Sequence, residues 1–260
     1  MLLRVRVTLP DRPGALGQVA RTLGVAGADI VQVVVLERLG GRAVDDFTVV
    51  WPGASRVERL LAGLAAIPGV QVDGVWKAIG APVSGGHDAE LLAQVAANPG
   101  DGLATLVDAE PGLLAADWAA AAIVPADWAS RAGAPRLPAD GTGLHLGSEP
   151  TTAYASWRAP DPLRLPEVTP LRARPLTGPD GTRYAVATFG RAGRVLVVAR
   201  CDDEELPGAA FHVTEVDRVA QLVRAAAVIL GDRLDRAGLP PVAGSVTDPA
   251  WPERRNAIPG

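Results

Sequence analysis

The sequence predicts an α+β fold with two domains, of which the first is a four-stranded, ferredoxin-like sheet with two helices. Two observations predict this fold. Apolar residues recur with strand and helix periods in the order βαββαβ over residues 1–78. After a short stretch of small residues at 79–86, a second series of helical and extended patterns covers residues 87–235. A chain of 260 residues is long enough for two such domains.

The chain begins with a strand that is followed by a helix. Leucine and valine alternate with arginine and threonine over residues 3–9, which is typical of a half-buried strand. Asp11 is a favourable helix N-cap and Pro13 fits the first helical turn, so we expect the helix to begin here. The apolar face of this helix is predicted by the spacing of Leu16, Val19, Ala20 and Leu23.

Three strands and one helix complete the first domain. Residues 29–36 are rich in valine and isoleucine, and residues 43–51 form a further strand beyond the glycine pair at 40–41. Helical spacing returns over residues 57–64, and a last strand covers residues 70–77. Four strands with both helices on one face make the split βαβ arrangement of a ferredoxin-like domain.

Two motifs in this domain resemble the signature of the ACT domain family. The first is Leu-Pro-Asp-Arg-Pro-Gly-Ala-Leu at residues 9–16, and the second is Gly-Ala-Asp-Ile at residues 27–30. The family is similar in its βαββαβ order, and the resemblance covers nearly all of residues 1–78. It implies a homodimer with a small-ligand site between two ACT modules, where the first strand–helix loop of one module faces the second strand of the other.

The resemblance assigns ligand contacts to Asp11, Arg12, Gly14, Ala15, Leu16, Asp29 and Ile30. The chemistry of these residues suits an amino acid. Gly14 lets the backbone approach a ligand closely, and the free N–H groups at the start of the helix favour a carboxylate. Asp11 and Asp29 can accept hydrogen bonds from an ammonium group, while Leu16 and Ile30 provide apolar walls. Alternatively, Asp11 is only a helix cap and Asp29 only a strand-entry residue, and neither binds a ligand.

Helices, one strand and long loops are predicted in the first part of the second region. Helical patterns cover residues 89–97 and, with interruptions, residues 102–114. An alanine-rich apolar run at 118–124 is expected to be the first strand of a second sheet. Proline and glycine are frequent over residues 135–152 and 160–170, which indicates loops.

Strands and a long helix are predicted in the last part of the chain. We expect strands at 171–176, 184–189 and 194–200. Thr214 is expected to cap the final helix, with Asp217 in the capping-box position. One face of that helix carries Val216, Val219, Ala220, Val223, Ala227 and Leu230. Residues 236–260 lack periodicity, and we expect them to form a poorly ordered tail.

The order of these elements is similar to that of a GAF domain over residues 87–235. The stretch Phe-His-Val-Thr-Glu-Val-Asp at residues 211–217, which leads into an alanine-rich helix, resembles the end of that family in particular. The resemblance implies a small-molecule pocket under the loops at 135–170, with Trp128, Tyr154 and Trp157 as candidate lining residues. Alternatively, these aromatic side chains fill a closed pocket.

Composition and motifs exclude several classes of function. A net charge of −4 is unfavourable for binding nucleic acid. His87, His145 and His212 lie in separate regions without the spacing of a zinc site, and neither a phosphate-binding glycine motif nor a nucleophile elbow is present. Cys201 is the only cysteine, so neither an intrachain disulfide nor a cysteine-based metal site can form. We therefore expect no cofactor, no metal and no enzymatic activity.

The same sequence bears on where the protein acts. Residues 1–10 lack the apolar core of a signal peptide, and no apolar run approaches the roughly 18–20 residues that span a membrane. We expect a cytoplasmic protein without a membrane partner.

The sequence thus predicts a non-catalytic regulatory protein that senses a small ligand, an amino acid by its chemistry, at an ACT dimer interface. Ligand binding would favour one arrangement of the chain, which a protein target would recognise. The alternative is a ligand-free assembly or scaffold protein that uses its ACT and GAF-like modules for dimerisation. A third hypothesis, an enzyme with its pocket in the second domain, requires polar residues to converge under the loops at 135–170.

Overall fold

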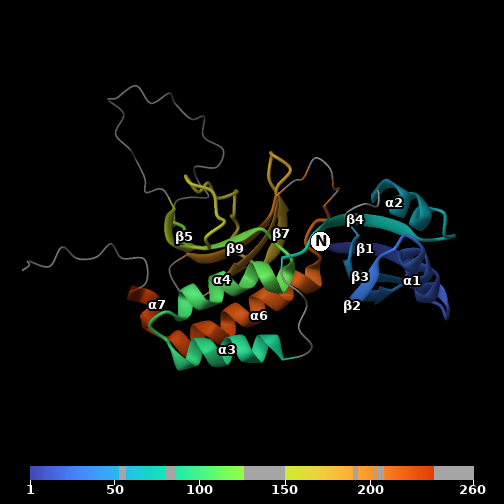
Figure 1. Ribbon diagram of the computed structural model, residues 1–260. Coiled ribbons are helices and arrows are strands. Elements are labelled where there is room, and N and C mark those ends of the chain that lie inside the picture. Colours follow the sequence, from blue (N-terminus) through green and yellow to red (C-terminus); the bar gives the residue numbers. More distant parts are fainter. Residues whose placement is uncertain are drawn as a thin grey trace, which may run out of the picture.

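The computed structural model confirms an α+β protein with two antiparallel sheets, each of which carries helices (Figure 1). It describes residues 1–52, 57–79, 86–125, 150–189, 193–201, 203, 206 and 208–236. The linker expected at 79–86 and the tail expected at 236–260 lie almost entirely outside the described residues. Within those residues, no helix combines the length and the apolar character needed to cross a membrane.

The first sheet has the strand order β2-β3-β1-β4 and belongs to the predicted ferredoxin-like domain. Its elements are β1 (Leu2–Pro10), α1 (Ala15–Val25), β2 (Asp29–Leu39), β3 (Arg42–Val50), α2 (Val57–Ala65) and β4 (Gln71–Lys77). The predicted alternation of buried apolar residues in β1 is confirmed. Leu3, Val5 and Val7 are fully buried in the core that α1 and α2 cover. Arg4 and Arg6 point to the opposite face, toward the second domain.

The N-cap of helix α1 lies three residues beyond the expected one. Gly14 occupies the N-cap with a φ of 88°, a left-handed conformation that glycine adopts at low cost, and no side chain caps the helix. The expectation that Asp11 is this cap is therefore wrong, since its carboxylate instead binds Arg38 at the end of β2. The buried face includes Ala15, whereas Leu16, which was expected on that face, is 42% exposed.

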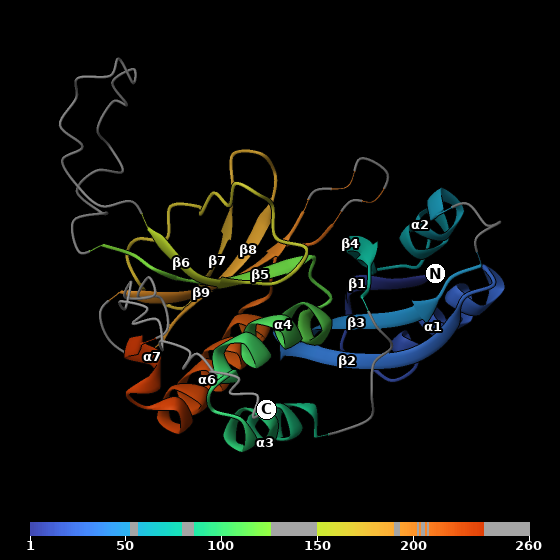
Figure 2. The same cartoon turned by 60° about the vertical axis from the view of Figure 1, so that its left-hand side comes forward.

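The second sheet has the strand order β6-β5-β9-β8-β7. Its strands are β5 (Trp118–Ile123), β6 (Thr151–Ala155), β7 (Arg174–Thr177), β8 (Arg183–Thr188) and β9 (Arg194–Arg200). The helices are α3 (His87–Ala97), α4 (Gly102–Leu114), α6 (Val213–Leu230) and the short α7 (Arg233–Arg236). Figure 2 shows α3, α4 and α6 together on one face of this sheet.

Both faces of the second sheet are buried, which explains why its strands are apolar without alternation. In β9, Leu196 and Val198 belong to the core beneath the helices, whereas Val195 and Val197 belong to a separate core on the other face. The second core is closed by loop residues, among which Val168 is fully buried.

This arrangement corrects the predicted lining of a pocket under the loops. Tyr154 packs against the helix-side core and donates a hydrogen bond to Asp108 of α4, so it lies on the other side of the sheet. Trp157 is 85% exposed, and the guanidinium group of Arg158 lies 4.9 Å from its ring centre. Trp128, the third candidate, lies outside the described residues.

Strand β7 and helix α6 begin at other residues than expected. Strand β7 starts at Arg174, three residues late. The N-cap of α6 is His212, whose side chain accepts a hydrogen bond from the Thr214 N–H, so the assignment of Thr214 as the cap is wrong. Glu215, and not Asp217, completes the capping box by accepting a hydrogen bond from the His212 N–H.

Candidate functional site

The strand–helix loop that the sequence analysis assigned to a ligand lies at one end of the first sheet. Asp11 and Arg38 form an exposed ion pair there, and hydrogen bonding from Arg38 lowers the pKa of Asp11. Arg12 is exposed, and Gly14 starts α1 without a side-chain cap. The Ala15 N–H at the start of α1 donates a hydrogen bond to the Arg12 carbonyl at 3.2 Å, so this loop already holds one charged pair and one first-turn N–H group.

The second half of the predicted ligand site lies at the other end of the same sheet. Asp29 is exposed at the first position of β2, opposite Val50 of β3. Ile30 is partly buried and packs against the first-domain core. From Asp29 to Arg38 the strand advances nine residues, or about 30 Å at the usual rise. One chain therefore does not bring Asp29 near Asp11.

A cluster of buried charges joins the two domains, and the sequence analysis did not find it. Arg6 of β1 binds Asp46 of β3 at 2.7 Å and Glu215 of α6 at 2.8 Å. Glu215 also binds Arg200 of β9 at 2.6 Å. These four side chains are at most 5% exposed. Positively charged residues alternating along the first strand were the only signal, and that pattern is equally typical of a strand face in water.

An aromatic ring lies within this charge cluster. The guanidinium groups of Arg6 and Arg200 lie 5.2 Å and 4.4 Å from the ring centre of Trp76 in β4. The Trp76 indole N–H donates a hydrogen bond to the Ala115 carbonyl of the second domain at 3.0 Å. Cation–π contacts and this hydrogen bond fix the relative position of the two domains.

The two arginines bound to Glu215 determine its charge. Burial alone would raise the pKa of Glu215, but Arg200 and Arg6 outweigh it and lower that pKa to about 2. Glu215 is therefore a carboxylate at neutral pH, with both oxygens bonded to guanidinium groups.

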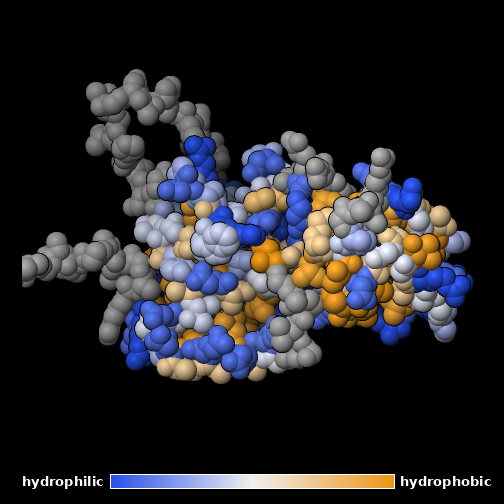
Figure 3. Space-filling view, viewed as in Figure 1, coloured by the Kyte–Doolittle hydropathy of each residue, from blue (hydrophilic) through white to orange (hydrophobic). Residues whose placement is uncertain are grey.

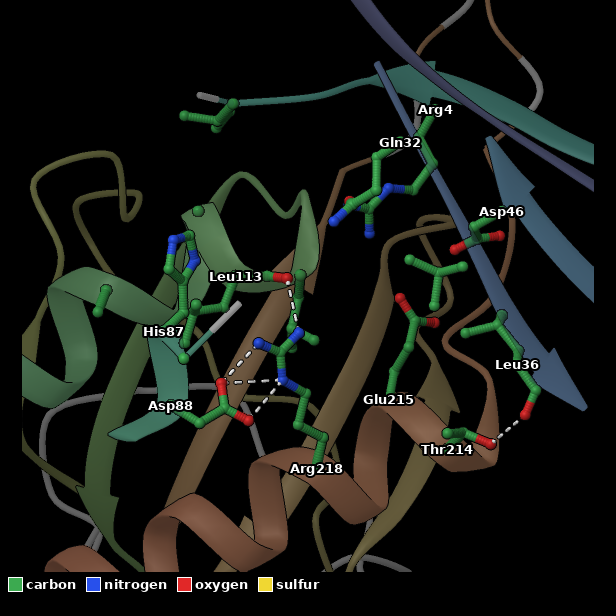
Figure 4. Close-up of a pocket in the computed structure, with 16 residues that line it drawn as sticks. Arg4, Gln32, Leu36, Asp46, His87, Asp88, Leu113, Thr214, Glu215 and Arg218 are labelled. Carbon is green, nitrogen blue, oxygen red and sulfur yellow. Dashed lines mark hydrogen bonds and ion pairs between the residues drawn. The ribbon is translucent and has the colours of Figure 1, made fainter. Parts of the chain in front are cut away.

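A cavity of about 540 Å³ lies beside this cluster, between the first sheet and the helices of the second domain (Figure 4). Charged and polar side chains line it from both domains: Arg4, Gln32, Asp46, His87, Asp88, Thr214, Glu215 and Arg218. Its apolar lining comes mainly from β2 and α4. Figure 4 shows Arg4 and Gln32 pointing into the cavity from the sheet, opposite Asp88 and Arg218.

An ion pair of the second domain lines the cavity on the side opposite Arg4, and a buried glutamate lies next to the lining. Arg218 of α6 binds Asp88 of α3 with both carboxylate oxygens, the shortest contact being 2.6 Å. Glu110 of α4 is fully buried next to the lining residue Ala109, and neither of its oxygens has a hydrogen-bond partner among the described residues. Burial raises the pKa of Glu110 to about 8, so this side chain is mostly protonated at neutral pH.

The chemistry available in the cavity is that of a binding site for a small molecule. A concave, mostly apolar space with a few convergent polar groups is the usual form of such sites. Among the described residues, no group of three or more His, Cys, Asp or Glu side chains is placed to hold a metal ion.

Comparisons with known proteins give partial likenesses only. No family model and no curated protein matches the chain. A formyltetrahydrofolate deformylase from Pseudomonas putida is 17% identical over 36% of this chain, with a TM-score of 0.27. An unknown protein from Galdieria sulphuraria is 16% identical over 48% of this chain and 72% of its own, also with a TM-score of 0.27. The chain spans 37% of the length of the deformylase, and no family assignment follows from these likenesses.

Proposed function

We propose that this protein is a homodimeric, non-catalytic regulatory protein of the cytoplasm, with an ACT-type first domain and a GAF-like second domain. Its first domain would bind an amino acid between two copies of the chain. The observation that carries this proposal is the free edge of β2. Strand β2 ends the sheet order, and among the described residues only β3 pairs with it.

The surface of β2 is unusually apolar for an edge strand. Val31, Val33 and Val35 are 47%, 39% and 52% exposed, and Figure 3 shows hydrophobic surface gathered over this end of the molecule. A long apolar edge strand favours pairing with another strand, and natural proteins otherwise protect such edges with charges, bulges or covering segments. A second copy of β2 is the partner that matches this edge in length and composition.

Antiparallel pairing of two β2 strands would also assemble the divided ligand site. With a twofold axis between Val33 and Val34, residue 29 of one strand lies opposite residue 38 of the other. Asp29 of one copy would then lie beside the Asp11–Arg38 pair and the start of α1 in the second copy. Asp29 would accept hydrogen bonds from the ammonium group, and the α1 N-terminus would hold the carboxylate. Arg12, Ala15, Leu16 and Ile30 would complete the walls.

A path for signalling leads from β2 into the second domain. The Thr214 hydroxyl donates a hydrogen bond to the Leu36 carbonyl at 3.0 Å, and His212 contacts Glu37 at 3.2 Å. A ligand that shifts β2 would act on the N-terminus of α6 through these contacts, and a protein target would recognise the result.

The dimer is tested by sedimentation equilibrium of the wild type and of the double variant Val33→Lys/Val35→Lys. We expect a dimer for the wild type and a monomer for the variant, because four lysines would meet around the twofold axis. Val228→Lys is the matched control, since Val228 is 84% exposed near the end of α6 in the second domain. A wild-type monomer at all concentrations would contradict the proposal.

The ligand is tested by thermal shift against the twenty amino acids at millimolar concentration, with Asp29→Ala as the variant. A ligand at a hundredfold excess over its Kd stabilises the folded state by about 2.7 kcal/mol. We expect a shift from one or a few amino acids that is lost in Asp29→Ala.

A ligand-free assembly protein is the second candidate. One observation favours it: Arg38 already binds the Asp11 carboxylate, as a structural pair would. A dimer that gives no thermal shift with any amino acid would support this function over the sensor.

A further inference from the structure

We propose that the cavity between the two domains binds a small carboxylic acid, as its monoanion, through the guanidinium group of Arg4. This site lies within one chain and is distinct from the proposed site between two copies.

The guanidinium group of Arg4 lies at the cavity without a hydrogen-bond partner among the described residues. Its Nε is buried without a hydrogen-bond partner, and no hydrogen bond or ion pair of its guanidinium group occurs within the described part of the chain. Burial lowers the pKa of Arg4, while Asp46 and Glu215 act in the opposite direction. A guanidinium group presents five donors, and leaving them unused in a cavity is costly. An anionic ligand would satisfy them.

The charged groups around the cavity do not cancel, because arginines outnumber carboxylates. Arg6 and Arg200 already occupy both oxygens of Glu215, and Arg6 occupies both oxygens of Asp46. Arg218 is neutralised by Asp88. Glu110 is mostly protonated at neutral pH. Arg4 is thus the one arginine, among these described groups, whose charge has no dedicated partner, and the site carries about one positive charge in excess.

The size of this excess determines the class of anion. A single carboxylate neutralises one guanidinium group and pairs with it through two parallel hydrogen bonds. A dianion such as sulfate would leave a net negative charge close to Asp46 and Glu215, which both line the cavity. Repulsion from these two carboxylates therefore favours a monoanion.

The other side chains that line the cavity indicate the chemistry of the rest of the ligand. Apolar surface in the cavity comes from Val34 and Leu36 of β2, Leu113 of α4 and Ile79. Gln32 and Thr214 add two neutral polar groups. The carboxylates among the described lining residues, Asp46, Glu215 and Asp88, all bind arginines and are not free to bind an ammonium group. The site thus fits an aliphatic carboxylic acid better than an amino acid.

The proposal is tested by calorimetric titration of the full-length protein with sodium 4-methylpentanoate at pH 7. The uncharged 4-methylpentan-1-ol and sodium sulfate serve as control solutes. We expect saturable binding of the carboxylate with little binding of either control. Arg4→Met should weaken the binding by about tenfold or more, because a charge-assisted pair is lost. Arg59→Met is the matched control, since Arg59 is exposed on α2 and should bind the carboxylate as the wild type does.

Thermal melting separates a binding role of Arg4 from a purely structural one. Without ligand, Arg4→Met should melt at or above the temperature of the wild type, because it removes a cation that has no partner. If Arg4 only supports the fold, the variant should melt lower and still bind the carboxylate. That result would overturn the proposal. So would tighter binding of sulfate than of the carboxylate, or the absence of saturable carboxylate binding by the wild type.

The outcome is independent of the dimer proposal. Val33→Lys/Val35→Lys and Asp29→Ala alter no residue that lines the cavity, so both variants should bind 4-methylpentanoate with wild-type affinity.

Discussion

Two buried glutamates show how hydrogen-bond partners decide the charge of a carboxyl group. Glu215 receives hydrogen bonds from two arginines and from the backbone N–H of His212, and its pKa falls to about 2. Glu110 is also buried, but its oxygens have no hydrogen-bond partner within the described part of the chain, and burial raises its pKa to about 8. The same side chain is therefore an anion in the charge cluster and mostly a neutral acid in the helical layer.

The raised pKa of Glu110 makes the free energy of unfolding depend on pH. Between about 4.5 and about 8, folded Glu110 keeps a proton that the unfolded chain releases, so its stabilising contribution is lost as the pH rises. The loss approaches about 1.4 kcal/mol per pH unit. Glu110→Gln should remove this slope in urea unfolding at pH 5, 6, 7 and 8.

An exposed glutamate provides the control for this measurement. Glu58→Gln on α2 changes the same group in water and should keep the wild-type slope. An unchanged slope in Glu110→Gln would show that Glu110 ionises normally in the folded protein.

At the scale of elements, the sequence predicts strands and helices better than their ends. The period-two pattern of β1 and the valine-rich β9 are local signals, and both strands form where predicted. The caps of α1 and α6 were misplaced because several neighbouring polar residues can cap a helix, and tertiary contacts choose among them. Asp11 forms an ion pair with Arg38 and does not cap α1. Glu215 forms an ion pair with Arg6 and also takes the capping-box position of α6.

The candidate cavity could not be predicted for a related reason. Arg6 and Glu215 are 209 residues apart in the chain, and no local pattern connects them. The predicted ligand site, by contrast, consists of two short motifs that can be found without tertiary structure. Asp11 belongs to the first of these motifs and Asp29 to the second. That both bind the same ligand stays a prediction.

Two glycines in turns allow a matched test of how tightly the second sheet is closed. Gly193 before β9 has a φ of 72°, and a Cβ there would lie 2.2 Å from the Val124 carbonyl oxygen. Gly40 between β2 and β3 has a φ of 60° with open space around it. Gly40→Ala should cost about 1–2 kcal/mol for the left-handed conformation alone. Gly193→Ala should cost about 4 kcal/mol or more, because the backbone must also move.

Chemical unfolding of the two variants measures this difference directly. Equal costs would mean that the turn before β9 relaxes freely and that its contact with Val124 does not constrain the sheet.

At the scale of the whole molecule, the two domains share one buried interface. Arg6 and Trp76 of the first sheet bind groups of the second domain, and Leu206 from beyond β9 belongs to the first-domain core. Separating the domains would break these contacts and expose Trp76, Ala115 and Ala209, which form a small apolar core between the domains. The protein is therefore expected to unfold as one cooperative unit, although its two sheets have separate cores.

Calorimetry can establish this coupling with two interdomain ion pairs that differ in burial. The wild type should give a single transition whose calorimetric and van't Hoff enthalpies agree. Arg6→Met removes the interdomain pair with Glu215 and leaves Asp46 without its buried partner. It should lower stability by about 3–5 kcal/mol and separate the transitions. Lys77→Met removes a pair with Asp203 in which Lys77 is 58% exposed, and should cost less than about 1 kcal/mol. Similar costs for the two variants, or two transitions in the wild type, would place the coupling of the domains outside the buried cluster.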